Sequence, residues 1–227
     1  MTFEEHRSTD PEARFTDWLR QGAEPHWTRM TTHRFARELG AGTLNDAVAS
    51  RYLVQDYAFV NSFVSLLGSA IAYAPVMPSK RPFAQFAAAV TADENDFFIR
   101  SFEALEVPEA VWRTPELAPV TRDFIDLLQS TGRSGSYAQV LSVLSAAEWS
   151  YLTWAKACPA ERPAQFWLAE WIELHTIPPF EAFVTWLREE TDRIGAAADG
   201  ETQQAMAANF RRMMELEEAF FDAAYSA

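Results

Sequence analysis

Apolar residues recur three or four positions apart along most of this chain, and the strict alternation of a half-buried strand is almost absent. That spacing gathers apolar side chains on one face of each helix, so the pattern predicts an all-α protein. The expected helices cover residues 11–21, 25–38, 44–74, 80–106, 117–131, 135–157, 162–175, 178–195 and 200–225. Short loops join them, and short loops make consecutive helices antiparallel neighbours, so we expect a helical bundle.

Glycine and proline mark the ends of the expected helices. Gly40 is expected to end one helix, and Thr43 or Asn45 can cap the next. Pro75 ends the long helix that follows. Pro178 can begin a helix, because its fixed φ suits the first helical turn.

The segment 57–79 carries no charged residue, which raises the question of a membrane span. Polar and small residues within it, such as Asn61, Ser65 and Gly68, recur at helical spacing, and Pro75 follows them. A lone span would also lack a partner helix in the bilayer. We therefore expect a buried core helix and no membrane partner.

The composition narrows the class of protein. The 227 residues can bury a sizeable core, and the prolines and glycines do not pool into a linker, so we expect one domain over residues 1–227. The 32 acidic and 19 basic residues give a net charge of −13, which opposes nucleic acid or an anionic membrane as partner. The one cysteine, Cys158, excludes an internal disulfide. Because the N-terminus also lacks an apolar signal segment, we expect a cytoplasmic protein.

Common signatures of catalysis and metal binding are missing. No phosphate loop, dinucleotide-binding glycine turn or Gly-x-Ser-x-Gly elbow occurs. None of the histidines, His6, His26, His33 and His175, forms a Glu-x-x-His pair on an evident core helix, the arrangement that holds di-iron centres in bundles. We expect no metal site, and we expect His33 to pack or cap near a helix end.

Acids inside apolar helices are the remaining candidates for chemistry. Asp56 lies beside a stripe of aromatic residues that includes Tyr52 and Phe59. Such a carboxyl can make a structural hydrogen bond to a neighbouring helix end. It can equally face a ligand, since desolvation raises a carboxyl pKa towards acid–base duty.

Two further acids share these surroundings. Glu148 precedes Tyr151 by three residues, which places an acid and a phenol on one helix face. Glu217 leans towards the aromatic stripe of the last helix, whereas Glu215 and Glu218 point elsewhere. For Glu148 and Glu217 a solvated acid and a functional acid both remain open.

Several segments, in order along the chain, resemble the TenA/thiaminase II family. Residues 32–60, THRFARELGAGTLNDAVASRYLVQDYAFV, are similar to the family's His-x-Phe segment, Gly-Thr-Leu turn and Tyr-x-x-Gln-Asp helix. The resemblance continues through Glu94, SYAQVLSVLSAAEWSY, FWLAEWIELH and ELEEAFFDAAY. It covers nearly the whole chain.

The resemblance implies a heme-oxygenase-like helical bundle that needs no cofactor and forms a dimer or tetramer. It implies a small-molecule pyrimidine as substrate, and aminopyrimidine hydrolysis that salvages the pyrimidine half of thiamin. By motif, Asp56 matches the acid that contacts the pyrimidine, and Phe59 the aromatic that stacks on the ring. Tyr151 matches the tyrosine on the nucleophile helix, and Glu217 the C-terminal acid–base glutamate.

The chain departs from the family at the nucleophile. The family's Pro-Cys pair aligns with Ala146 and Ala147. Cys158 cannot replace that cysteine, because it lies about 16 Å further along the helix at ~1.5 Å per residue. The chain looks closer to a branch that lacks the cysteine and relies on a glutamate, for which Glu148 is a candidate beside Glu217.

The expected pocket therefore combines carboxylates with aromatic side chains. The catalytic candidates are Asp56, Glu148 and Glu217, and the substrate-binding candidates are Phe59, Tyr151, Tyr52 and His175, the last replacing a tyrosine of the family.

The first interpretation is a carboxylate-assisted aminopyrimidine hydrolase. The alternative is a catalytically inactive pyrimidine-binding or regulatory protein. A third alternative is an oxidase of the same bundle class, either cofactor-free or di-iron. The shortage of inward-facing histidines disfavours the di-iron form.

Overall fold

A computed structural model describes residues 2–226, and every regular element in that range is helical. The helices are α1 (Phe3–Thr9), α2 (Phe15–Gly22), α3 (His26–Thr31), α4 (Arg34–Gly40), α5 (Asp46–Tyr73), α6 (Met77–Ala89), the π-helical segment η1 (Val90–Glu94), α7 (Asn95–Ala104), α8 (Glu109–Arg113), α9 (Pro119–Arg133), α10 (Tyr137–Ala157), α11 (Phe166–Leu174), α12 (Pro178–Ala197) and α13 (Gly200–Ala223). The expected all-α bundle is confirmed.

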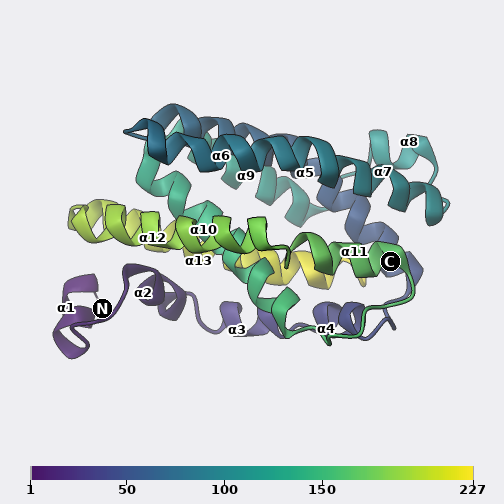
Figure 1. Cartoon of the computed structure of the whole chain (residues 1–227), viewed down its shortest axis with the longest axis horizontal. Helices are drawn as coiled ribbons and strands as arrows, with labels where there is room; N and C mark the ends of the chain where they lie inside the picture. The colour runs from purple at the N-terminus through teal and green to yellow at the C-terminus, as the bar shows by residue number, and fades with distance from the viewer. Residues whose placement is uncertain (1, 227) are drawn as a thin grey trace.

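The helices lie in three tiers (Figure 1). The upper tier holds α5, α6 and α9, the middle tier α12 and α13, and the short helices α1 to α4 lie below. Helix α10 runs obliquely through the middle and packs against α12, α13 and α5. Most of α10 is buried, since its sequence is apolar on nearly every face. This helix therefore provides the centre around which the site is built.

Local signals set most of the helix ends as expected. Asn45 caps α5 by accepting a hydrogen bond from the backbone N–H of Ala47, and α5 ends just before Pro75. Pro178 is the first residue of α12. Among residues 2–226 no helix has both the length and the apolar character needed to cross a bilayer.

The sequence pattern was wrong about one helix and missed two others. Residues 25–38 form α3 and α4, because His33 is extended and its Nδ1 accepts the N–H of Phe35 to start a new helix. Helix α1, which begins at a Thr2 capping box, and the five-residue α8 were not expected, because such short helices show little periodicity.

The expected helix over 80–106 contains a break in its hydrogen-bond pattern. Helix α6 passes through the π-helical turn η1 into α7 without a loop. A π turn inserts one extra residue and so rotates the following side chains relative to those before it. Glu94 is the last residue of this turn.

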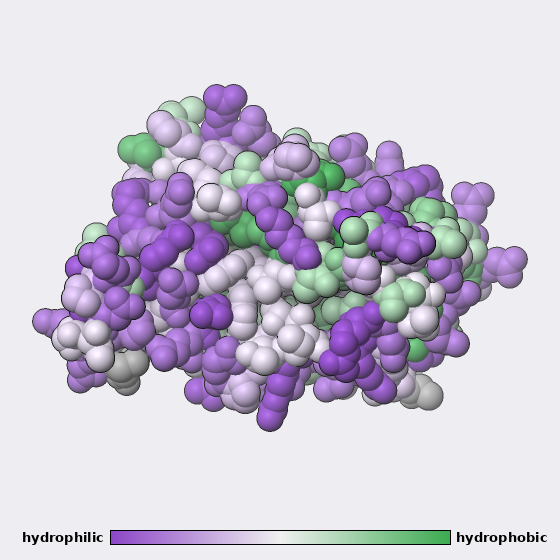
Figure 2. Space-filling view, turned by 60° about the horizontal axis from the view of Figure 1, so that its bottom comes forward, coloured by the Kyte–Doolittle hydropathy of each residue, from purple (hydrophilic) through white to green (hydrophobic). Residues whose placement is uncertain are grey.

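Polar side chains cover most of the face shown in Figure 2, where green, apolar side chains are seen mainly in recessed patches. The buried apolar residues form one cluster that extends through the tiers. Aromatic pairs are frequent in it. Phe59, for example, stacks on Phe124 with ring centroids 4.9 Å apart and an interplanar angle of 3°. Such contacts fix ring orientations next to the site.

Candidate functional site

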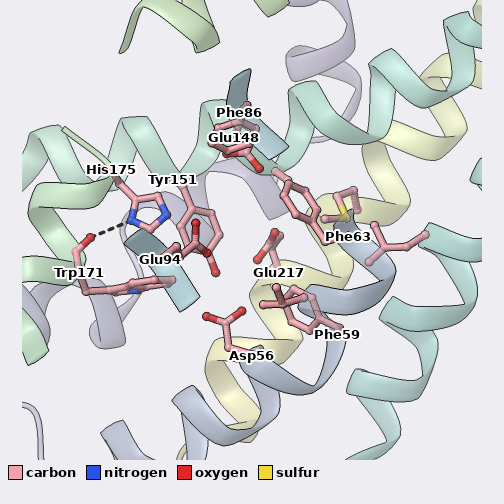
Figure 3. Close-up of a pocket in the computed structure, with 14 residues that line it drawn as sticks. Asp56, Phe59, Phe63, Phe86, Glu94, Glu148, Tyr151, Trp171, His175 and Glu217 are labelled. Atoms are coloured by element: carbon pink, nitrogen blue, oxygen red, sulfur yellow. Dashed lines mark hydrogen bonds between the residues drawn. The ribbon is translucent and has the colours of Figure 1, made fainter. Parts of the chain in front are cut away.

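A cavity lies where α5, η1, α10, α11 and α13 meet (Figure 3). The space open to the centre of a water molecule is about 50 Å³. By the same measure a single water needs about 10 to 15 Å³, so the cavity has room for several waters or one small ring. Four carboxyl groups point into it, from Asp56, Glu94, Glu148 and Glu217.

The structure brings together six of the seven side chains expected at the site. Asp56, Phe59, Glu148, Tyr151, His175 and Glu217 all line the cavity. Tyr52 does not line the cavity. Its hydroxyl lies 2.8 Å from the hydroxyl of Tyr151, which does. Their roles in binding or catalysis stay predictions.

The solvated-acid interpretation is wrong for Glu148 and Glu217. The exposed fraction is 5% for Asp56, 7% for Glu148 and 2% for Glu217. The neighbours of Glu217 do point elsewhere, as expected: Glu215 pairs with Arg211, and Glu218 contacts His26 at 2.6 Å. Buried carboxyls without a cationic partner are costly, so their gathering in one cavity marks a candidate functional site.

Two carboxyl oxygens in the cavity lack a partner. Asp56 Oδ2 and Glu217 Oε2 are buried and form no hydrogen bond with any described residue. Buried polar atoms in folded proteins are almost always paired, so each exception needs an explanation. A ligand that fills the cavity and bonds both oxygens would supply one.

Burial raises the pKa of each cavity carboxyl, and for Asp56, Glu148 and Glu217 the charge of neighbouring carboxylates adds to the rise. For Asp56 the main cause is burial, followed by the charge of Glu94, while the Tyr52 hydroxyl acts in the opposite direction. Burial also raises the pKa of Glu148 and of Glu217, and nearby carboxylates add to both shifts. The cluster therefore holds protons at a pH where isolated carboxyls have lost them, so it can both donate and accept protons.

Glu94 is the cavity acid that was not among the expected site residues. Burial raises its pKa to about 7. It follows Asp93 and precedes Asn95 and Asp96 in the sequence. The resemblance included Glu94 among its matching residues, which was the one available signal.

The phenols of Tyr52 and Tyr151 form a pair at the edge of the carboxyl cluster. Burial is the main cause that raises the pKa of both, and neighbouring carboxylates add to it. Both phenols therefore stay protonated at neutral pH. One hydroxyl must donate to the other, which leaves one proton of the pair free to bond a ligand or carboxylate.

His175 is neutral at physiological pH. Burial lowers the pKa of its imidazole to about 4. Its Nδ1 lies 2.8 Å from the carbonyl oxygen of Trp171 (Figure 3). A carbonyl only accepts hydrogen bonds, so Nδ1 carries the proton and Nε2 is left as an acceptor.

Ala147 lines the cavity at the position where the resemblance implies a missing cysteine. Cys158 follows the last residue of α10, with its Sγ 3.5 Å from the carbonyl oxygen of Trp154. It is not among the residues that line the cavity. The only thiol of the chain therefore lies outside the site, as the helical rise predicted.

Over residues 2–226, no group of three or more His, Cys, Asp or Glu side chains has an arrangement that could hold a metal ion.

A family model described as the TENA/THI-4/PQQC family matches residues 20–227 of the chain. A curated relative from Helicobacter pylori, named aminopyrimidine aminohydrolase, is 22% identical over 213 residues, which cover 92% of this chain and 98% of the relative.

Solved structures share the architecture. A TenA homologue from P. horikoshii OT3 superposes with a TM-score of 0.83 at 20% identity, over 94% of this chain and 99% of that one. A domain of unknown function from Shewanella denitrificans OS217, described as having a heme oxygenase-like fold, superposes with a TM-score of 0.67 at 14% identity, over 92% and 91%. The expected heme-oxygenase-like bundle is therefore confirmed.

Proposed function

The chain belongs to the TENA/THI-4/PQQC family, and we propose that it is a hydrolase that releases ammonia from a small aminomethylpyrimidine without a cysteine nucleophile. The name of the Helicobacter pylori relative, aminopyrimidine aminohydrolase, supports this class of reaction. We infer that the chain acts in pyrimidine salvage and belongs to the branch of the family that lacks the cysteine.

The observation that carries the proposal is the pair of unpartnered carboxyl oxygens, Asp56 Oδ2 and Glu217 Oε2, in a small cavity with aromatic walls. An aminopyrimidine presents a flat ring with hydrogen-bond donors and acceptors on its edge. Such a molecule would satisfy buried carboxyl oxygens and stack on the walls at the same time.

In the proposed complex, the pyrimidine ring lies between Phe59 and Tyr151. Phe59 is held in place by its stacking on Phe124. Asp56 bonds the amino group and the adjacent ring nitrogen, and its raised pKa lets it donate a proton to that nitrogen as well as accept from the amino group. His175 Nε2 and the tyrosine pair supply further polar contacts.

The proposed reaction uses water directly. Glu217 accepts a proton from water, the water oxygen bonds to the methylene carbon, and the carbon–nitrogen bond breaks. Glu94 donates a proton to the leaving nitrogen, which departs as ammonia and leaves a hydroxymethylpyrimidine. Glu148 is the alternative base. Because Ala147 offers no thiolate, no covalent enzyme–substrate adduct forms on α10.

The test is ammonia release from aminomethylpyrimidine by the purified protein. Glu217→Gln is expected to lower kcat by about 100-fold or more, since general acid–base groups contribute that much. Glu218→Gln is the matched control, because Glu218 is the adjacent residue of α13 but contacts His26 instead of the cavity. Full activity of Glu217→Gln would overturn the assignment of the base, and the same loss in Glu148→Gln alone would move it to Glu148.

The second candidate is a pyrimidine-binding protein without turnover. Ala147, at the position of the family's nucleophile, favours it. In that case calorimetry would show pyrimidine binding, Asp56→Asn would weaken it, and no ammonia would form. Ammonia release that depends on Glu217 excludes this candidate.

Assembly and location complete the proposal. We expect a dimer or tetramer, supported by the exposed apolar side chains of Val76 and Met77 at the start of α6. Sedimentation of the purified chain tests this. The single cysteine is compatible with a reducing, cytoplasmic compartment.

A further inference from the structure

His175 presents one ring nitrogen to the cavity of the carboxyl cluster. The residue is buried and directly follows the last residue of α11. Its Nδ1 bonds the Trp171 carbonyl oxygen, and its Nε2 lies on the side of the ring that faces Tyr151 and the cavity (Figure 3). Among residues 2–226, none forms a hydrogen bond with Nε2. This nitrogen is therefore available to a ligand.

Three aromatic rings hold the imidazole in this orientation. The ring centroid of His175 lies 4.5 Å from that of Trp171, 4.9 Å from that of Tyr151 and 5.2 Å from that of Phe180. A half-turn of the imidazole would place a carbon against the Trp171 carbonyl oxygen and break the hydrogen bond of Nδ1. Packing and hydrogen bonding therefore keep Nε2 towards the cavity.

Nε2 differs from the carboxyl groups and the phenol of the cavity because its role is fixed. The protonated carboxyls and the Tyr151 hydroxyl can each donate or accept a hydrogen bond. His175 carries its one proton on Nδ1, where the Trp171 carbonyl accepts it. Burial lowers the pKa of the imidazole to about 4, so no second proton binds at neutral pH. Nε2 can therefore only accept a hydrogen bond.

An acceptor that cannot change its role discriminates between ligands. A ligand N–H that points at Nε2 forms a hydrogen bond, whereas a bare ring nitrogen in its place leaves both lone pairs without a donor. A ring that fills a cavity of about 50 Å³ leaves little room for a water to supply the missing proton. Sites built to bond an N–H group strongly reject analogues that lack it.

The direction of approach assigns the donor to a position on the ring. In the proposed complex, Asp56 bonds one amino group and the ring nitrogen beside it. His175 enters the cavity from the end of α11 and Asp56 from α5, so His175 meets another part of the ring edge (Figure 3). That part of a pyrimidine holds the second ring nitrogen and the carbon between the two nitrogens. An amino group on this carbon supplies an N–H, whereas the second nitrogen offers only a lone pair.

We propose that His175 makes the site selective for 2,4-diaminopyrimidines, which carry a second amino group on the carbon between the ring nitrogens, over 4-aminopyrimidines with a methyl group there. This inference rests on the proposed function, because it seats the ring next to Asp56. It extends that function by naming a substituent of the preferred substrate.

Titration calorimetry with two probes tests the proposal. The probes are 4-amino-5-aminomethyl-2-methylpyrimidine and 2,4-diamino-5-aminomethylpyrimidine. We expect the diamino compound to bind about tenfold more tightly, the usual size of one hydrogen bond. Equal affinities, or tighter binding of the methyl compound, would overturn the proposal.

Variants separate this contact from the greater basicity of the diamino ring, which the carboxyl groups favour without His175. His175→Phe keeps an aromatic ring without the acceptor, and His175→Tyr supplies a hydroxyl that both donates and accepts. Both are expected to lose most of the tenfold preference. Circular dichroism identifies the folded variants, and either one suffices for the comparison. A tenfold preference that survives in a folded histidine variant would contradict the proposal.

The residue next to His175 provides the matched control. The Thr176 hydroxyl bonds the Ile172 carbonyl one turn earlier, as His175 bonds that of Trp171, but Thr176 does not line the cavity. Thr176→Val is expected to keep the preference. If it loses the preference as the histidine variants do, the selectivity does not arise from Nε2.

Nitrogen NMR of protein with isotope-labelled histidine tests the tautomer, and His175→Phe identifies the resonances of His175. We expect a proton on Nδ1, and a shift of the Nε2 resonance on binding of the diamino compound that the methyl compound does not cause. A proton on Nε2 in the free protein would overturn the proposal.

Failure of the proposed function gives a different result. If the diamino compound binds more tightly but neither probe releases ammonia, the selectivity stands and the hydrolase does not. If both probes release ammonia with equal kcat/KM and bind equally, the hydrolase stands and the role of His175 fails. Absence of binding by both probes overturns both.

Discussion

The hydroxyl oxygens of Tyr52 and Tyr151 lie 2.8 Å apart, and their hydrogen bond joins α5 to α10 beside the carboxyl cluster. Both phenols are buried, so neither can replace its partner with bulk water. The bond therefore fixes the ring of Tyr151, which lines the cavity of the carboxyl cluster, through Tyr52, which does not line it.

Tyr52→Phe should weaken catalysis through Tyr151. Loss of the hydrogen bond leaves the Tyr151 hydroxyl without its partner, which costs about 1 to 3 kcal/mol of unfolding free energy. We expect kcat for ammonia release to fall about tenfold as Tyr151 loses its position. Tyr73→Phe is the control, since it removes a hydroxyl of α5 that bonds the Gly132 carbonyl instead. An equal loss of kcat in both variants would contradict a positioning role.

Glu94 should set the alkaline limit of activity. Its pKa is raised to about 7, so its proton is lost as the pH rises through neutrality. If Glu94 donates this proton to the leaving nitrogen, kcat/KM falls about tenfold per pH unit above that point. Glu94→Gln should lower kcat and remove the fall of kcat/KM at alkaline pH. Glu103→Gln, at an exposed position of α7, should leave the dependence of kcat/KM on pH unchanged. If kcat/KM still falls at alkaline pH in Glu94→Gln, the proton that is lost belongs to another group.

The buried carboxyls should make the fold less stable as the pH rises. Their pKa values are raised in the folded state, so between the usual carboxyl pKa and the raised one the native state binds more protons than the unfolded state. The free energy of unfolding therefore falls as the pH rises through this window.

Removal of one of these carboxyl groups should weaken the fall in the free energy of unfolding with rising pH. Asp56→Asn is expected to raise the free energy of unfolding by about 1 to 3 kcal/mol at pH 8 and by much less at pH 4, where the wild-type carboxyl is protonated. Asp46→Asn, at the exposed first turn of α5, should give no such gain, since an acid there favours the helix. Urea denaturation at the two pH values measures both variants. Equal shifts at both would contradict the assignment.

Gly195 should tolerate no side chain. A Cβ at this position of α12 would lie 2.2 Å from the buried ring of Phe15. Gly195→Ala is therefore expected to lower the free energy of unfolding by about 1 to 3 kcal/mol through overpacking. Gly68→Ala in α5 meets no atom within 4 Å and should raise stability by about 0.5 to 1 kcal/mol. Thermal unfolding compares the two, and equal melting temperatures would refute the close approach.

Some features of the site follow from the sequence alone. Tyr52, Asp56 and Phe59 lie four and three residues apart, so any helix over this segment places them on one face. The same holds for Glu148 and Tyr151. Asn45, Pro75 and Pro178 act on backbone within a few residues, so these helix ends could be expected too.

Only the tertiary structure decided which of these faces meet. Tyr52 and Tyr151 are 99 residues apart in sequence, and their bond depends on how α5 crosses α10. Glu94 lies in a polar run at the end of η1, and the packing of helices from distant parts of the chain makes it part of the cavity lining. Periodicity is a property of one helix, whereas a cavity is the space left between several. The sequence therefore determined which residues share a face, and the packing of the helices decided where the cavity lies and which acids line it.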